Sequence, residues 1–364
     1  MKSAVLFVVF NRPDTTARVF ETIRAAKPPR LYVAADGPRA GRAGEAVLCA
    51  RVRQLATQLD WPCKLHTLFR DTNLGCKMGV SSAINWFFEH EERGVVLEDD
   101  ILSQPSFFDY CDEMLDRYKD DTNVSMVSGC NLLSKRLQMQ QSYFFSRYVY
   151  IWGWATWRRA WKHYDVTMAQ WPAWCASGAL QQVLGGDSAL ALYWKNIFNQ
   201  VHSGRIDTWD YQWVFTCWKE RGLDIVPVRN LIENLGFGPD ATHTTMETPQ
   251  LLLESIPQDL VFPLRHPTAV ERSLVAVKWT PDLRQKFKMS SNPGNPENDR
   301  NQETQNPHAG VQSEGGIGGF AERKDHQPNQ PGIWGASDSG GAVEKGHSRR
   351  CQKAVRGQAR PQAG

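Results

Sequence analysis

Short apolar runs and helical patterns alternate along the first hundred residues, and this order constrains the fold more than any other feature. The apolar runs are typical of strands covered on both faces and lie at residues 4–10, 31–35, 64–69 and 95–97. Between them, apolar residues recur at helical spacing: Val19, Phe20, Ile23 and Ala26, then Leu48, Val52, Leu55 and Leu59, then Val80, Ile84, Phe87 and Phe88. The alternation predicts an α/β fold with a mainly parallel sheet and helices on both faces.

Two changes in composition divide the rest of the chain. Ten of the 14 tryptophans lie between residues 150 and 218, after a further helical pattern and an apolar run at 123–128. From Ser290 to Gly364 there are 13 Gly and 6 Pro but only two aromatic residues, Phe320 and Trp334. Such a segment buries too little apolar surface to offset its ordering entropy, so we expect residues 289–364 to form a disordered tail.

Charge, cysteines and hydropathy exclude several classes of protein. A net charge of +3 is too small to favour nucleic acid as a partner. The eight cysteines form no C-x-x-C pair, which favours reduced thiols over a disulfide framework. No run approaches the length of a transmembrane segment, and the apolar start lacks a cleavage site. We expect a cytoplasmic protein, and peripheral attachment to an inner membrane stays open.

Three consecutive acids, Glu98, Asp99 and Asp100, follow the apolar run at 95–97. Buried carboxylates repel one another, and a hard divalent cation removes this difficulty because carboxylate oxygens are its natural ligands. The acids also lie where parallel sheets bind ligands, at the carboxyl end of a strand. A solvated acidic loop before a helix is the alternative interpretation.

Polar residues follow the other early strands at the same expected edge of the sheet. They are Arg12 after the first strand, Asp36 after the second, and Arg70 with Asn73 after the third. Each has an ordinary alternative, since Asp36-Gly37-Pro38 is typical of a turn and residues 70–75 can form a plain loop. Their convergence favours a nucleotide crevice. No P-loop motif is present, and no G-x-G-x-x-G follows the first strand.

Seven motifs make a resemblance specific. In chain order they are FNRPDTTARVFETI, AADGPR, RDTNLGCKMGVSSAINWFF, VVLEDDILSQPSFFDY, YIWGWATWRRAW, TWDYQW and NLGFGPDATHT. Over about residues 3–285 the chain resembles bacterial nucleotide-diphospho-sugar glycosyltransferases of the GT-A fold. That group is similar to family 2 glycosyltransferases and to N-acetylglucosaminyltransferase I. The resemblance implies a nucleotide-sugar-binding half at residues 1–130 and an acceptor-binding, catalytic half at 131–288.

The resemblance also implies roles for individual residues. Asp100 would hold Mn²⁺ or Mg²⁺, Asp99 would contact the ribose, and Glu98 the donor sugar. Arg12 and Asp36 match positions that hold the uridine. In the Trp-Asp pair of TWDYQW, the acid Asp210 matches the family's catalytic base. The nearby Asp207 is the alternative candidate for this role. The segment from Asn234 to His243 matches a loop that folds over the nucleotide-sugar.

The residues alone leave some of these roles open. Asp210 lies among Trp209, Tyr211 and Trp213, and an apolar wall would raise its pKa towards that of a general base. A helix of core tryptophans with a solvated acid explains the same pattern. The tryptophans at 152, 154, 157 and 161 also have two interpretations: they could stack against a bound sugar or pack in the hydrophobic core. His243 suits a loop hydrogen bond better than metal ligation.

Together these observations predict an inverting, metal-dependent hexosyl- or N-acetylhexosaminyltransferase. It would move a sugar from a UDP-sugar donor to a glycan, lipid-linked glycan or glycoconjugate acceptor. A non-catalytic nucleotide-sugar or carbohydrate-binding protein is the alternative from another class. That alternative would dispense with the metal acids, whereas all three are present. A retaining transferase without a base is disfavoured by the TWDYQW match.

Overall fold

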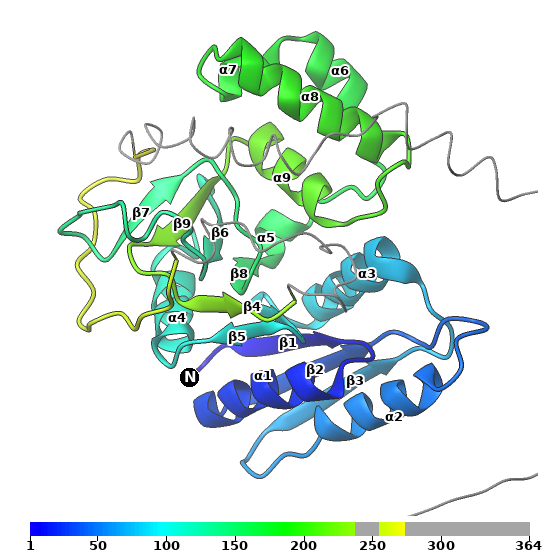
Figure 1. Cartoon of the computed structure of the whole chain (residues 1–364). Helices are drawn as coiled ribbons and strands as arrows, with labels where there is room; N and C mark the ends of the chain where they lie inside the picture. The colour runs from blue at the N-terminus through cyan, green and yellow to red at the C-terminus, as the bar shows by residue number, and fades with distance from the viewer. Residues whose placement is uncertain (237–254, 274–364) are drawn as a thin grey trace, which may run out of the picture. The chain divides into compact units, whose positions relative to one another are not determined.

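The computed structural model describes residues 1–236 and 255–273, all within the compact unit Met1–Pro296. The predicted tail at 289–364 and His243 lie outside the described residues. The fold is α/β and Rossmann-like: a mixed sheet of eight strands, in the order β3-β2-β1-β4-β8-β6-β9-β7, carries helices on both faces (Figure 1). The predicted fold class is confirmed.

The first half of the sheet follows the predicted alternation. Its parallel strands are β1 (Ala4–Val9), β2 (Arg30–Ala35), β3 (Lys64–Phe69) and β4 (Arg93–Glu98). The helices between them are α1 (Pro13–Ala26), α2 (Glu45–Leu55) and α3 (Gly75–His90). In Figure 1, α1 and α2 lie together on one side of these strands and α3 lies on the other.

The second half of the sheet is mixed. Strand β8 (Trp154–Trp157) is antiparallel to both β4 and β6 (Val124–Ser128), β9 (Leu223–Pro227) is parallel to β6, and β7 (Tyr143–Ser146) is antiparallel to β9. Strands β5 (Ile101–Ser103) and β10 (Ile232–Asn234) form a separate antiparallel pair. The remaining helices are α4 (Ser106–Arg117), α5 (Arg158–Trp161), α6 (Trp171–Ala176), α7 (Ala179–Val183), α8 (Ser188–His202) and α9 (Asp210–Lys219).

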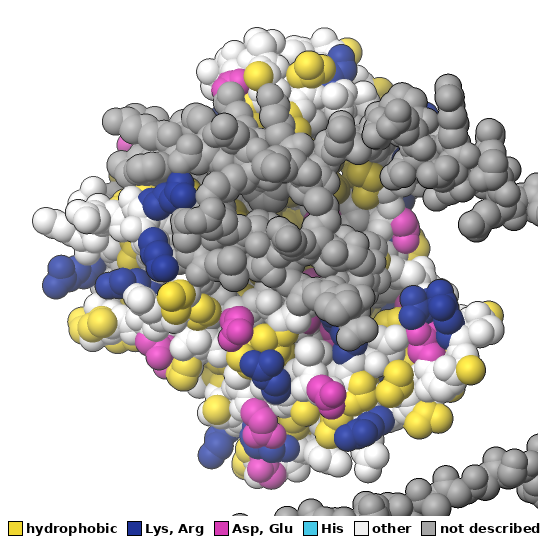
Figure 2. Space-filling view, in the orientation of Figure 1, with side chains coloured by type: hydrophobic (Ala, Val, Ile, Leu, Met, Phe, Trp, Pro, Cys, Tyr) yellow, Lys and Arg dark blue, Asp and Glu magenta, His cyan; other side chains and the backbone are white. Residues whose placement is uncertain are grey.

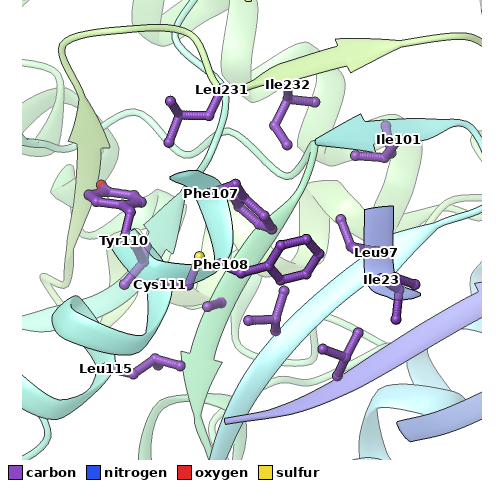
Figure 3. Packing of buried hydrophobic residues seen from close by; sticks show 14 of the residues in the cluster. Ile23, Leu97, Ile101, Phe107, Phe108, Tyr110, Cys111, Leu115, Leu231 and Ile232 are labelled. Carbon is purple, nitrogen blue, oxygen red and sulfur yellow. The ribbon is translucent and has the colours of Figure 1, made fainter. Parts of the chain in front are cut away.

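Alternating side chains of β1 serve two cores, one on each face of the sheet. Val5, Phe7 and Val9 pack with α1, α2 and α4, whereas Ala4 and Leu6 pack with α3, α5 and α9. This explains why the strand reads as a continuous apolar run. Figure 3 shows Leu97, Ile101 and Phe108 within the first core.

The orientation of α2 differs from the prediction at one position. The sequence pattern places Leu48 on the buried stripe with Val52, but the side chain of Leu48 is 40% exposed. Cys49 takes the inner position and is 2% exposed. The helix begins at Glu45 and is apolar on both faces over this stretch, so periodicity alone could not separate inner from outer residues.

Three of the four tryptophans in the YIWGWATWRRAW motif are core residues. Trp154, Trp157 and Trp161 are between 1% and 3% exposed, and Trp154 stacks on Trp209 with ring centroids 5.7 Å apart. The core interpretation therefore holds for these three, and Trp152 is half-buried. Among residues 1–236 and 255–273, no helix has the length and apolar character that crossing a membrane requires.

Asp224 of β9 is a buried acid, 1% exposed, in the mixed half of the sheet. The Ser128 hydroxyl oxygen lies 2.6 Å from both Asp224 Oδ2 and the Tyr150 carbonyl oxygen. A hydroxyl has one proton, so both bonds form when Ser128 donates to Tyr150 and a protonated Asp224 donates to Ser128. Burial accordingly raises the pKa of Asp224 well above its usual range.

We expect Asp224→Asn to flatten the pH dependence of stability. A raised folded-state pKa contributes stability below the unfolded value of about 4, and this contribution is lost as pH rises towards the folded pKa, by up to ~1.4 kcal/mol per pH unit. The asparagine variant should therefore gain in unfolding free energy relative to wild type as pH rises. Chemical denaturation across that range checks this, with the exposed Asp71→Asn as control. A constant difference between variant and wild type would contradict it.

Candidate functional site

The strand order changes direction between β1 and β4, and we call the space beside this end of the sheet, where ligands bind in such folds, the crevice. Strand β1 pairs in parallel with β2 on one side and with β4 on the other, and Val8 lies opposite Glu98. Open α/β sheets bind ligands outside the carboxyl ends of strands at such a switch point. Arg12 follows β1 at this edge. Glu98 is the last residue of β4, and Asp99 and Asp100 follow it.

Buried neighbours hold the three acids in place. Leu97 before them and Ile101 after them are 0% and 2% exposed, which leaves the intervening segment little freedom. The Leu235 N–H donates to the Asp100 carbonyl oxygen at 2.8 Å. Gly236 then passes so close that a Cβ there would lie 2.2 Å from Asp100 Oδ2. The chain after β10 thus packs directly against the predicted metal ligand.

The Arg12 side chain forms ion pairs with two of the three acids, Asp99 and Asp100. Its guanidinium donates to Asp99 Oδ1 and, at 3.0 Å, to Asp100 Oδ2. The Phe10 N–H donates to the other Asp99 oxygen at 3.1 Å, and the Asp99 side chain is only 3% exposed. Burial opposes the charge on Arg12, but Asp99 and Asp100 raise its pKa above the usual value. Asp99 therefore ties the ends of β1 and β4 together.

Several carboxyl groups lie close to one another at this edge of the sheet. Burial, followed by Asp100 and Asp99, raises the pKa of Glu98 to about 8, and Asp210 adds to the shift while Arg12 opposes it. Because Asp210 affects the pKa of Glu98, the start of α9 must lie near the end of β4. Among the described residues, Arg12 pairs with Asp99 and Asp100, and Glu98 and Asp210 lie beside this ion-paired group.

The first two residues of α3, Gly75 and Cys76, lie beside these acids. Gly75 lies against Asp207, since a Cβ on Gly75 would be 3.4 Å from Asp207 Oδ2. Burial, then Glu98, Asp210, Asp207 and Asp100, raise the pKa of the Cys76 thiol to about 12. No residue pattern in the sequence marks Cys76 or Gly236 as a functional residue. The only signal was their position inside the motifs RDTNLGCKMG and NLGFG.

Asp210 is the first residue of α9 and is half-buried. Its Oδ1 atom accepts hydrogen bonds from the Thr208 hydroxyl and, at 2.9 Å, from the Tyr211 N–H. Trp209 and Trp213 beside it are 2% and 0% exposed. The predicted aromatic wall is therefore present, built from core tryptophans, and Asp207 is the more exposed of the two acids.

The other predicted donor-binding residues organise the loop before α3. Asp36 accepts from the Leu74 N–H at 2.9 Å and the Gly75 N–H at 3.2 Å. Asn73 donates to the Gly37 carbonyl oxygen at 3.0 Å, and Arg70 donates to the Ser82 hydroxyl at 2.7 Å. These contacts fix the rim of the crevice. They account for a structural role of all three side chains.

Within residues 1–236 and 255–273, no group of three or more His, Cys, Asp and Glu side chains is arranged to hold a metal ion by itself. A cation at Asp100 would thus take few ligands from these residues. Ions such as Mg²⁺ bind proteins through one or two carboxylates and complete their shell with water and substrate phosphates.

No protein-family model and no curated protein matches the chain. Among solved structures, the mannosyltransferase PcManGT from Pyrobaculum calidifontis, in complex with GDP-Man and Mn²⁺, is 16% identical with a TM-score of 0.29, over 43% of this chain and 45% of that one. TarS from S. aureus is 11% identical with a TM-score of 0.30, over 46% and 50%. A UDP-glucose pyrophosphorylase complexed with UDP-glucose is 8% identical with a TM-score of 0.28, over 45% and 79%. The chain spans about half the length of the first two.

Proposed function

We propose that the protein is an inverting glycosyltransferase that moves a sugar from a UDP-sugar to a glycan or lipid-linked acceptor. The observation that carries the proposal is the convergence at the switch point. Arg12 after β1 pairs with Asp99 and Asp100, which follow β4, and these groups together with Asp210 of α9 shift the pKa of Glu98. A binding module needs no such concentration of acids, because like charges placed together are costly to hold.

The acids fit a divalent cation. Arg12 pairs with Asp99 and Asp100, and the pKa of Glu98 is raised by burial and then by the nearby Asp100 and Asp99. A cation would relieve this repulsion, and we assign it to Asp100, with Mn²⁺ or Mg²⁺ as the candidates. When bound, such an ion supplies positive charge that neutralises a departing diphosphate.

The remaining roles follow from position in the crevice. We assign residues 1–130 to the donor, with Arg12, Asp36, Arg70 and Asn73 at the nucleotide end of the crevice. Asp99 and Glu98 would then meet the ribose and the donor sugar, and His243 belongs to this proposal through its motif alone. Residues 131–288 would bind the acceptor.

Asp210 is assigned as the general base. The acceptor hydroxyl oxygen attacks the anomeric carbon, the bond from that carbon to the diphosphate breaks, and Asp210 takes the hydroxyl proton. The hydrogen bonds from Thr208 and Tyr211 hold its Oδ1 atom in place. One attack from the face opposite the diphosphate inverts the anomeric centre.

The purified full-length chain, incubated with a panel of UDP- and GDP-sugars and Mn²⁺, should slowly hydrolyse one donor without an acceptor. Mass spectrometry of the released nucleoside diphosphate identifies that donor, and excess EDTA should stop the release. Donor binding by calorimetry without any release or transfer, across a panel of glycan acceptors, would instead support the non-catalytic alternative.

A further inference from the structure

The exposed face of α2 is unusually apolar for a surface helix. Val47 and Leu48 are 71% and 40% exposed, and Ala46 and Ala50 beside them are exposed as well. The opposite face is also apolar, with Cys49 buried and Val52 in the core cluster with α1. A helix that is apolar on both faces is usually buried on both. The outer face of α2 therefore has the character of a surface that meets a partner.

Basic side chains surround this apolar face. Arg42 and Arg51 are exposed, and the Arg39 side chain is 44% exposed. Between residues 37 and 59 the only acid is Glu45, which is 5% exposed and accepts from Arg39 Nε at 3.0 Å. We name Arg39, Arg42, Ala46, Val47, Leu48, Ala50 and Arg51 the α2 surface. Figure 2 shows hydrophobic side chains gathered at the lower right, where Figure 1 has α2, next to Lys and Arg side chains.

The loop before α2 faces open space at two glycines. The loop that precedes the helix has Gly41 and Gly44 in the left-handed region, at φ 75° and 79°. A Cβ at either glycine would meet nothing within 4 Å. The exposed α2 surface combines apolar side chains with basic ones. It suits a broad, deformable partner that is both apolar and anionic.

We propose that the α2 surface binds the surface of an anionic lipid bilayer. Val47 and Leu48 would enter the boundary between headgroups and acyl chains, while Arg42 and Arg51 contact anionic headgroups. Each arginine near such a surface strengthens binding by about fivefold, and its effect weakens as salt rises. Two shallow apolar side chains and a few cations give reversible attachment.

The position of this surface connects it to the crevice. Asn11, the neighbour of Arg12, donates to Glu45 at 2.9 Å, so the first turn of α2 is tied to the edge of the sheet that carries the acids. A bilayer on the α2 surface would therefore lie near the crevice. If the proposed function holds, this favours an acceptor that is itself anchored in the bilayer, such as a lipid-linked glycan.

Co-sedimentation of the full-length chain with vesicles, without nucleotide or metal, tests the proposal. Vesicles of phosphatidylcholine with phosphatidylglycerol should bind the protein, and vesicles of phosphatidylcholine alone should bind it at least tenfold less. Val47→Glu and the double variant Arg42→Gln/Arg51→Gln should each lose at least about tenfold in binding to the anionic vesicles. The assay involves no turnover, so its outcome is independent of the proposed reaction.

Helix α8 supplies matched controls. Leu192 is 60% exposed and Lys195 is exposed, so Leu192→Glu replaces an apolar side chain by an acid and Lys195→Gln removes one positive charge away from α2, and both should leave binding unchanged. All five substituted sites are exposed, so circular dichroism should report an intact fold in each variant. Equal binding to both kinds of vesicle, or equal loss in the α8 variants, would overturn the proposal. So would a dimer in light scattering that Val47→Glu dissociates, because the α2 surface would then bind a second copy.

Discussion

Asp100→Ala is expected to remove turnover almost completely while the fold stays intact. The side chain makes one ion pair, with Arg12 at 3.0 Å, and Arg12 keeps Asp99 as a partner. The hydrogen bond from Leu235 goes to the Asp100 backbone and survives the substitution. Losing several kcal/mol of metal-derived stabilisation of the leaving group corresponds to about 10³-fold or more in rate.

Two measurements separate a lost metal ligand from a general disturbance. Calorimetry of UDP binding with and without Mn²⁺ should show that the affinity of the variant no longer depends on the metal. Asp71→Ala, which removes an exposed acid from the same edge of the sheet, should behave as wild type. If Asp100→Ala kept the wild-type Mn²⁺ dependence of UDP binding, the metal assignment would be wrong.

The first half of the fold could be predicted because its information is local. Strand β3 begins and ends at the predicted residues, and β1, β2 and β4 agree within two residues at each end. In a parallel sheet covered on both faces, apolar runs mark strands, and the connecting helices show their own period. From that order, the polar ends of β1 and β4 were expected at one edge, as observed.

The second half could not be predicted in the same way, because its pairings depend on long-range contacts. Strand β8 has the sequence WATW, which carries no clear alternation, and it lies antiparallel beside β4. The contact of Arg12 with Asp99 joins residues 87 positions apart. The exposure of Leu48 was also missed, because α2 is apolar on both faces. In each case the local sequence pattern is compatible with more than one arrangement, and tertiary packing determines which one forms.

The role of Asp210 can be separated from donor binding by one isosteric change. In Asp210→Asn the side-chain oxygen that accepts from Thr208 and Tyr211 is kept, so the start of α9 should hold its conformation. The variant lacks a group that can take the proton of the acceptor hydroxyl. We expect kcat for transfer to fall by about 10²–10⁴-fold, because that is the usual contribution of a general base.

Asp207→Asn is the matched control, since Asp207 is an exposed acid three positions earlier and also faces the crevice. It should lose far less in kcat, and both variants should bind the UDP-sugar with near wild-type affinity in calorimetry. A large loss of kcat in Asp207→Asn with a small loss in Asp210→Asn would show that Asp207, and not Asp210, is the general base. Near wild-type kcat in both variants would remove the base altogether and favour a retaining reaction. The two kinetic measurements together therefore decide which acid, if either, takes the proton.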